Sequence, residues 1–335
     1  MPIVPIVTLR ARPLQAVVAL AGLVFVNLPA HGNAYPEKPV RFIVAYPAGG
    51  SADLIARVIG QKLTDALQQP FVIDNRGGAG GLIGEELAVK SAPDGHTLLL
   101  VSISHVVNPQ LNTKLAHNPM RDLAPVSLLV SVPNVLVVLH SLPVKSVPEL
   151  ITLAKTKPGQ LNYATSLGTS LHLAGELFKA MAGVDIIAVN FKGGGLAAAD
   201  LQAGRVQMSF SVFQTAVSLV KTGRLNALGI TSAKRSQLLP EVPAIAEFLP
   251  GYELTGWLGM VAPAGTPSAI VNKLSGEIAA ILRAPDAQSR MLALGADPIG
   301  STPEQFARFR KTEFAKISKL MSRMNTQTER TEGKR

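Results

Sequence analysis

The hydrophobic positions of the chain fall into short extended runs that alternate with helical repeats. The first unit starts at residues 40–45, most of which are β-branched or aromatic, as in a buried parallel strand. A helical repeat follows, with apolar residues at Leu54, Ile55, Val58, Ile59, Leu63 and Leu67. The pattern predicts a strand, a tight turn and a helix, in that order.

The turn of this first unit has the sequence Tyr46-Pro47-Ala48-Gly49-Gly50-Ser51-Ala52-Asp53. Its two glycines leave backbone N–H groups uncovered at the helix N-terminus, where the helix dipole favours an anion. We expect Ser51 to cap the helix or to donate its hydroxyl to a ligand, and Asp53 to brace the turn by accepting backbone N–H groups. Because any strand-to-helix turn favours Gly and Ser, a purely structural role also fits.

A second glycine-rich turn, at residues 75–84, allows a competing interpretation. It has the Gly-x-Gly-x-x-x-Gly spacing of a dinucleotide-binding variant, which also requires an acidic residue at the end of the next strand. The next strand, 97–101, is followed by no acidic residue, so nucleotide binding is disfavoured. Ser102, Ser104 and His105 lie instead at its carboxyl end, where open α/β sheets bind ligands.

The second half of the chain repeats the unit. A strand at 161–164 runs into the hydroxyl-rich turn Thr165-Ser166-Leu167-Gly168-Thr169-Ser170, and a helix follows. Two such helix N-termini facing one another would form a clamp for an anion. A third glycine turn contains Lys192, which either meets the anion or is solvated. His172, one turn into the helix, either points at a ligand or has a capping or packing role.

Three long apolar runs, 124–129, 134–139 and 254–262, indicate that the chain passes between two α/β domains. We expect a first lobe of residues 35–133 and 256–322 and a second lobe of residues 134–255. Residues 323–335 are polar and charged and are expected to be a disordered tail.

The first 34 residues have the layout of a secretory signal peptide. Arg10 and Arg12 precede an uncharged apolar run at 16–26, and small residues follow up to Ala34. The run is too short to span a bilayer, and a retained amphipathic anchor is the alternative. Cleavage after Ala34 predicts a mature protein in a bacterial periplasm. The chain has no cysteine, so disulfides and thiolate chemistry are excluded.

The net charge of +10 does not indicate a nucleic-acid partner. The residues from Arg308 onward hold nine Lys or Arg and three Glu, so the surplus is concentrated at the C-terminus. Aromatic residues make up only 5% of the chain, whereas a nucleic-acid surface interleaves basic and aromatic side chains. We interpret the charge as a solvated helix and tail; docking to a membrane partner is the weaker alternative.

Sequence motifs for catalysis, metals and cofactors are absent. The chain has no His-x-x-His or His-Glu-x-x-His pair, no Gly-x-Ser-x-Gly elbow and no phosphate loop. The sequence therefore predicts no catalytic residue, no metal and no cofactor. An enzyme would need carboxylates distant in sequence to converge in one cleft.

At the level of motifs the chain resembles the Bug family, the TctC-like periplasmic receptors of tripartite tricarboxylate transporters. The resemblance covers almost the whole mature chain, and many motifs occur in the same order. They include Ala92-Pro93-Asp94-Gly95 and the segments 35–41, 46–53, 75–81, 158–164, 168–173, 231–236 and 262–267.

The resemblance implies a two-lobed α/β "Venus flytrap" of the type II kind, with a mixed sheet flanked by helices in each lobe and crossover strands between them. It implies a monomeric receptor that holds a small carboxylate without catalysis and delivers it to membrane permease subunits. Presentation of the ligand to a membrane sensor kinase is the alternative. The ligand contacts it implies are the turns 46–53 and 165–170, which bind through backbone N–H groups, hydroxyls and waters.

The chain also departs from the family pattern at four positions, where Ala48, Ala52, Leu167 and Ser211 stand in place of the residues frequent in relatives. Relatives often have Asp at the position of Ser211, and that carboxylate could pair with a ligand ammonium group. Its absence predicts a non-amino mono- or dicarboxylate. Leu167 and Phe213 are expected to add an apolar wall.

Overall fold

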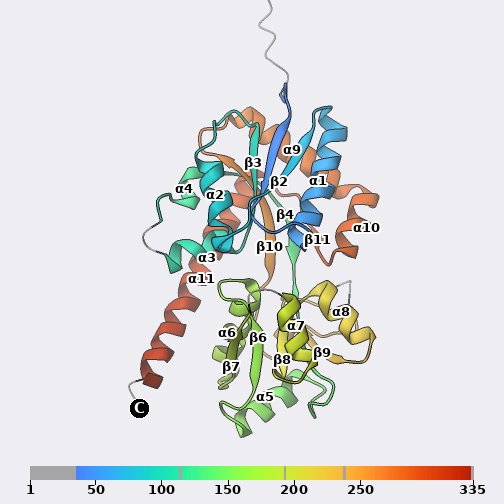
Figure 1. Ribbon diagram of the computed structural model, residues 1–335, viewed down its shortest axis with the longest axis vertical. Coiled ribbons are helices and arrows are strands. Elements are labelled where there is room, and N and C mark those ends of the chain that lie inside the picture. Colours follow the sequence, from blue (N-terminus) through green and yellow to red (C-terminus); the bar gives the residue numbers. More distant parts are fainter. Residues whose placement is uncertain (1–34, 113–114, 192–193, 237–238, 333–335) are drawn as a thin grey trace, which may run out of the picture. The chain divides into compact units, whose positions relative to one another are not determined.

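The computed structural model describes residues 35–112, 115–191, 194–236 and 239–332 (Figure 1). Residues 35–335 form one compact unit. The predicted signal peptide lies outside the described residues, as does Lys192.

The first lobe is built on a six-stranded mixed sheet with the strand order β11-β4-β10-β3-β1-β2. The strands β1, β2 and β3 are parallel, whereas β10 is antiparallel to both β3 and β4. Its strands are β1 (Val40–Val44), β2 (Phe71–Asn75), β3 (Thr97–Ser102), β4 (Leu123–Val132), β10 (Gly256–Pro263) and β11 (Asp297–Pro298). Its helices are α1 (Ser51–Leu67), α2 (Leu82–Val89), α3 (Ser104–Leu111), α4 (Pro119–Asp122), α9 (Ser268–Arg283), α10 (Pro285–Ala293) and α11 (Pro303–Glu332), with a 3-10 turn η1 (Ala79–Gly81).

The second lobe has a five-stranded sheet with the order β7-β6-β8-β5-β9. Here too three parallel strands, β7, β6 and β8, adjoin an antiparallel strand, β5. Its strands are β5 (Asn134–Leu139), β6 (Asn162–Thr165), β7 (Ile187–Asn190), β8 (Met208–Val212) and β9 (Leu225–Ile230). Its helices are α5 (Val147–Thr156), α6 (Ser170–Ala182), α7 (Gly194–Gln202) and α8 (Phe213–Lys221), with a 3-10 turn η2 (Ile245–Glu247).

The strand-turn-helix units form because their apolar positions match the faces they bury. In β1 every residue but Arg41 is fully buried, as expected for a strand covered on both faces. In α1 the residues Ile55, Ile59 and Leu63 form one apolar stripe, and all three are fully buried. The sheet places the C-terminal ends of β1 and β3 at the same edge, so the turns that follow them lie together.

Only Pro133 separates β4 in the first sheet from β5 in the second. The chain returns to the first lobe between β9 and β10. Thr231, at the start of this connection, is fully buried and bonds to Asn134 at the crossing. The Thr231 hydroxyl accepts from the Asn134 amide at 2.9 Å, and the Thr231 amide donates to the Asn134 carbonyl at 2.9 Å. The predicted two-lobed α/β fold with crossover strands is confirmed.

The terminal helix differs from the sequence-based expectation at its end. The sequence predicts a disordered tail from residue 323, whereas α11 continues to Glu332. Residues 323–332 contain neither Pro nor Gly. Extension of an existing helix needs no new nucleus, so a polar segment without breakers can continue it.

Candidate functional site

The turn before α1 is held by a buried carboxylate. Gly49 has φ +83°, a conformation that favours glycine, and its amide donates to Asp53 Oδ2 at 2.9 Å. Asp53 is only 2% exposed, and it also accepts from Asn75 Nδ2 at 3.0 Å and from Arg57 Nε at 3.0 Å. Burial raises the pKa of Asp53, but hydrogen bonds from Arg57, Gly49 and Asn75 outweigh it, so the pKa lies below its ordinary value. Asp53 is therefore an ionised brace.

Ser51 does not cap α1, contrary to one of the two roles the sequence suggests. Gly50 occupies the N-cap position without any side-chain cap, and Ser51 is the first helical residue. The first N–H groups of α1 are consequently left without a capping oxygen. By contrast, α5 is capped by the Ser146 hydroxyl, which accepts from the Glu149 amide.

Behind this turn lies a cluster of three hydroxyl groups. The Tyr46 hydroxyl donates to Ser102 Oγ at 2.6 Å and lies 2.9 Å from Ser104 Oγ; the two serine oxygens are 3.2 Å apart. Burial raises the pKa of Tyr46, although hydrogen bonds with Ser102 and Ser104 oppose the shift. The cluster is therefore neutral at physiological pH and can donate and accept hydrogen bonds.

The turn before α6 is held by neutral groups. The Leu167 amide donates to Asn190 Oδ1 at 3.0 Å, and the Thr169 hydroxyl donates to the Ser166 carbonyl at 2.6 Å. Gly168 has φ +74°. Thr169 occupies the N-cap position but makes no side-chain cap, so the N-terminus of α6 is also left uncapped.

Two adjoining cavities meet at these helix N-termini. We name the first, of about 660 Å³, the interlobe cleft; it is lined by the Tyr46, Ser102 and Ser104 hydroxyls and by both turns. We name the second, of about 360 Å³, the second-lobe chamber; it lies mainly against β6, β8, α7 and α8. Ser51, Ser166 and Thr169 border both. None of the described residues lining either cavity has a charged side chain.

The residues predicted from sequence are divided between these cavities and their supports. The residues of the predicted set that line a cavity are Tyr46, Gly50, Ser51, Ala52, Ser102, Ser104, Thr165, Ser166, Leu167, Gly168, Thr169, Ser170 and Ser211. Ala48, Gly49 and Asp53 do not line either cavity. Asp53 instead holds the turn by accepting a hydrogen bond from the Gly49 amide.

Phe213 is a correction to the predicted apolar wall. It is 8% exposed and belongs to a buried cluster of the second lobe with Leu201 and Ala216. Its side chain also fills the space beside Gly295, where an added Cβ would approach Phe213 Cβ to 2.4 Å. Phe213 is the first residue of α8, and it is absent from the lining of both cavities.

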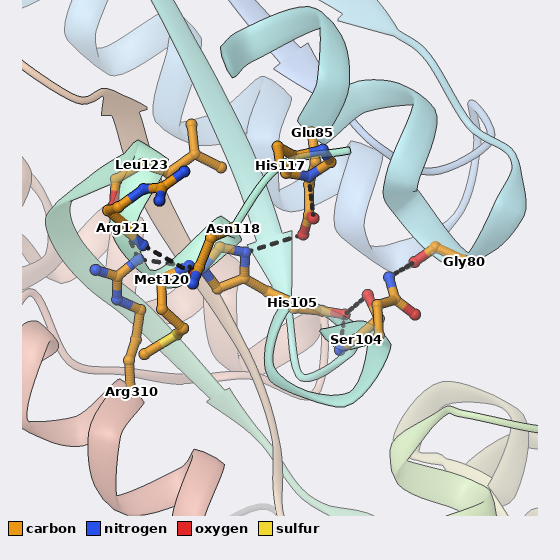
Figure 2. A network of polar contacts seen from close by, with 12 residues as sticks. Gly80, Glu85, Ser104, His105, His117, Asn118, Met120, Arg121, Leu123 and Arg310 are labelled. Atoms are coloured by element: carbon orange, nitrogen blue, oxygen red, sulfur yellow. Dashed lines mark hydrogen bonds and ion pairs between the residues drawn. The ribbon is translucent and has the colours of Figure 1, made fainter. Parts of the chain in front are cut away.

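His105 is a second correction, because it lines neither cavity and its ring points toward Glu85 (Figure 2). It is fully buried, its Nδ1 lies 2.9 Å from Glu85 Oε1, and its Nε2 lies 3.1 Å from Arg310 Nη1. His117 approaches the other oxygen of Glu85 at 3.4 Å, and Glu85 raises the pKa of His117. Burial lowers the pKa of Arg310 to about 10. This network joins α2, α3 and α11.

Several cavity residues were not anticipated from the sequence. The second glycine turn, 78–81, lines the cleft beside Asn108 and Asn134, and Thr215 and Leu219 line the chamber. The spacing of the glycine turn indicates nucleotide binding rather than a place in this cleft. The other residues carry no local signal, because their positions depend on how distant elements pack.

Within the described part of the chain, no helix is both long and apolar enough to cross a membrane. The same part holds no group of three His, Cys, Asp or Glu residues arranged to bind a metal.

Residues 55–326 match the profile of the family described as "Tripartite tricarboxylate transporter family receptor" (TctC). The chain belongs to this family. TctC proteins are periplasmic solute-binding receptors, so the protein is a receptor and not an enzyme, as the sequence predicts.

Curated TctC relatives align over most of the chain. The "UPF0065 protein in tcbD-tcbE intergenic region" of Pseudomonas sp. strain P51 is 39% identical over 86% of this chain and 87% of its own. Protein BugT of Bordetella pertussis is 37% identical over 86% of this chain and 89% of its own. The resemblance to the Bug family is thereby confirmed.

Two solved structures share the fold. R. palustris Rpa4515 with adipate is 36% identical, with a TM-score of 0.79 over 86% of this chain and 97% of that chain. MatC (Rpa3494) from Rhodopseudomonas palustris with bound malate is 31% identical, with a TM-score of 0.74 over 85% of this chain and 99% of that chain.

Proposed function

We propose that this TctC receptor binds a small, non-amino carboxylate, whose carboxylate group lies between the N-termini of α1 and α6. The observation that carries the proposal is that both helices lack a side-chain cap and border the same cavity. Backbone N–H groups at helix N-termini, aided by the helix dipole, favour an anion. Ser51 and Ser166 add hydroxyl groups at the junction of the two cavities, while the Thr169 hydroxyl holds the turn by donating to the Ser166 carbonyl.

Neutral donors are sufficient for this task. A hydrogen bond to a charged group contributes about 1.5–3 kcal/mol, so a few such bonds give micromolar affinity after the entropy of association is subtracted. Two relatives with the same fold are described with adipate and with malate bound, both of them carboxylates. The absence of acidic side chains among the described lining residues supports a ligand without an ammonium group.

The same proposal includes the route of the solute. The signal-peptide pattern at residues 1–34 supports export and cleavage after Ala34. The family description supports delivery of the ligand to the membrane subunits of a tripartite tricarboxylate transporter.

The test is a thermal unfolding screen of residues 35–335 against a panel of carboxylic acids, followed by calorimetric titration. A ligand at 100 times its Kd adds about 2.7 kcal/mol to the free energy of unfolding. The matched control is the primary amide of each acid that binds, and we expect it to produce no shift.

Equal binding of acid and amide would contradict a carboxylate site. So would a panel without any shift, if mass spectrometry of the denatured protein also released no carboxylic acid that had copurified.

A further inference from the structure

The second-lobe chamber has a different chemistry from the cleft it adjoins. Its aliphatic lining comes from three helices and two strands around it, through Ala164, Leu171, Ala197, Leu201, Val212 and Leu219. Hydroxyl groups, among them Ser209 and Thr215, complete the wall. None of its described lining residues is charged.

A polar atom in this wall has no hydrogen-bond partner among the described residues. Thr165 is 2% exposed, and its Oγ1 makes no hydrogen bond to any described group. A buried hydroxyl left unpaired is unfavourable, so a ligand atom or water that reached it would be stabilised there. Ser209, in contrast, already donates to the Ala164 carbonyl at 3.1 Å.

We propose that the chamber receives an uncharged, largely apolar part of the ligand, so that the preferred substrates are carboxylates with an aliphatic or aromatic body. The inference rests on the proposed carboxylate site, because in that proposal Ser51 and Ser166 at the mouth of the chamber hold the acid group. A neutral oxygen on the ligand body can accept from Thr165 Oγ1.

The size and the charge of the chamber support this assignment. An apolar cavity of about 150 Å³ already accepts benzene, and this chamber measures about 360 Å³. A second carboxylate in the chamber would be desolvated without a cation among the described lining residues, which is strongly unfavourable. The second acid group of a dicarboxylate would therefore stay in the interlobe cleft, near the Tyr46 hydroxyl.

The experiment is a calorimetric titration of residues 35–335 with propanoate, butanoate, hexanoate, 3-phenylpropanoate and adipate. We expect affinity to rise about fourfold for each added methylene that enters the chamber. We also expect hexanoate and 3-phenylpropanoate to bind more tightly than adipate.

A matched pair of variants on α7 tests the location. Ala197 lines the chamber, whereas Ala199 on the same helix is exposed. Ala197→Phe should weaken hexanoate and 3-phenylpropanoate at least tenfold and leave propanoate unchanged. Ala199→Phe should change none of them. If Ala197→Phe does not fold, the titration series with the wild-type protein still tests the proposal.

The outcomes separate the two proposals. Binding of propanoate without any gain from longer bodies, or tighter binding of adipate than of hexanoate, overturns the chamber and leaves the receptor intact. Equal loss of propanoate and hexanoate in Ala197→Phe also overturns the chamber. Failure of every acid, with no copurified acid released on denaturation, overturns the carboxylate site itself.

Discussion

The turn before α1 and the turn before α6 occupy equivalent places in the two lobes, but they are held by different chemistry. Each follows the central strand of three parallel strands and leads into an uncapped helix. The first is braced by the ionised side chain of Asp53, whereas the second is braced by the Asn190 amide oxygen and the Thr169 hydroxyl. Only the first brace can titrate.

The surroundings of the two turns also differ in polarity. The turn of the first lobe is backed by the hydroxyls of Tyr46, Ser102 and Ser104. The turn of the second lobe opens onto the aliphatic chamber. The comparison teaches that the same backbone arrangement recurs in both lobes with different side chains around it. In the proposed site, those side chains decide what the rest of the ligand meets.

The largest expected effect comes from removing an N–H group and a hydroxyl at each helix start. Proline is tolerated at the first helical position, so Ser51→Pro and Ser170→Pro should fold. We expect Ser51→Pro to weaken the best-binding carboxylate about 100-fold and Ser170→Pro about tenfold, since Ser51 borders both cavities and Ser170 only the cleft. Calorimetric titration measures both.

The control for this pair is Ser268→Pro, at the exposed first position of α9 and away from both cavities. It should leave the affinity unchanged. A larger loss for Ser170→Pro than for Ser51→Pro would reverse the ranking of the two turns.

We expect an intermediate effect, on the free energy of unfolding, when the side chain that holds either turn is replaced. Asp53→Asn should lower the free energy of unfolding at pH 7 by about 1–3 kcal/mol, because buried hydrogen bonds to a charge are lost. Since the pKa of Asp53 is lowered in the folded state, the stabilisation is present above its ordinary value of 3.8. It should disappear as the pH falls through the lowered folded-state pKa. Thr169→Val should cost about 1 kcal/mol at every pH.

Urea unfolding between pH 2 and pH 7 measures these differences, with Asp65→Asn on the exposed face of α1 as the control. A pH-independent effect of Asp53→Asn would show that its charge does not hold the turn.

The smallest expected effect concerns the hydroxyl cluster. Tyr46→Phe should weaken adipate about threefold to tenfold, the value of one hydrogen bond, and leave hexanoate unchanged. The two acids serve as each other's control in one titration series. An equal loss for both would mean that the Tyr46 hydroxyl positions the turn rather than meeting the far end of the ligand.

The sequence predicts the features of this fold that are local. The units from β1 to α1 and from β6 to α6 depend on contiguous residues, so the sequence pattern predicts them. The position of His105 after a strand predicts a place in the cleft, but its partners Glu85 and Arg310 lie 20 and 205 positions away. Such a contact leaves no local pattern.

The same reasoning explains which parts of the site were predictable. The two turns were predictable from the sequence, because their glycine and hydroxyl residues are the types that a strand-to-helix turn favours. The chamber was not, because Ala197, Leu219 and Ala164 come from three separate elements that meet only through packing. Small apolar residues on helices indicate burial but not whether the space before them is filled.

The single residue between β4 and β5 also limits how relatives of this chain can differ in length. Successive residues of a strand face opposite sides of its sheet. One residue inserted beside Pro133 would therefore reverse which face of the β5 sheet follows from a given face of the β4 sheet. The hydrogen bonds between Asn134 and Thr231 would be lost at the same time. We expect insertions and deletions in TctC evolution to avoid this crossing and to gather in the loops far from it.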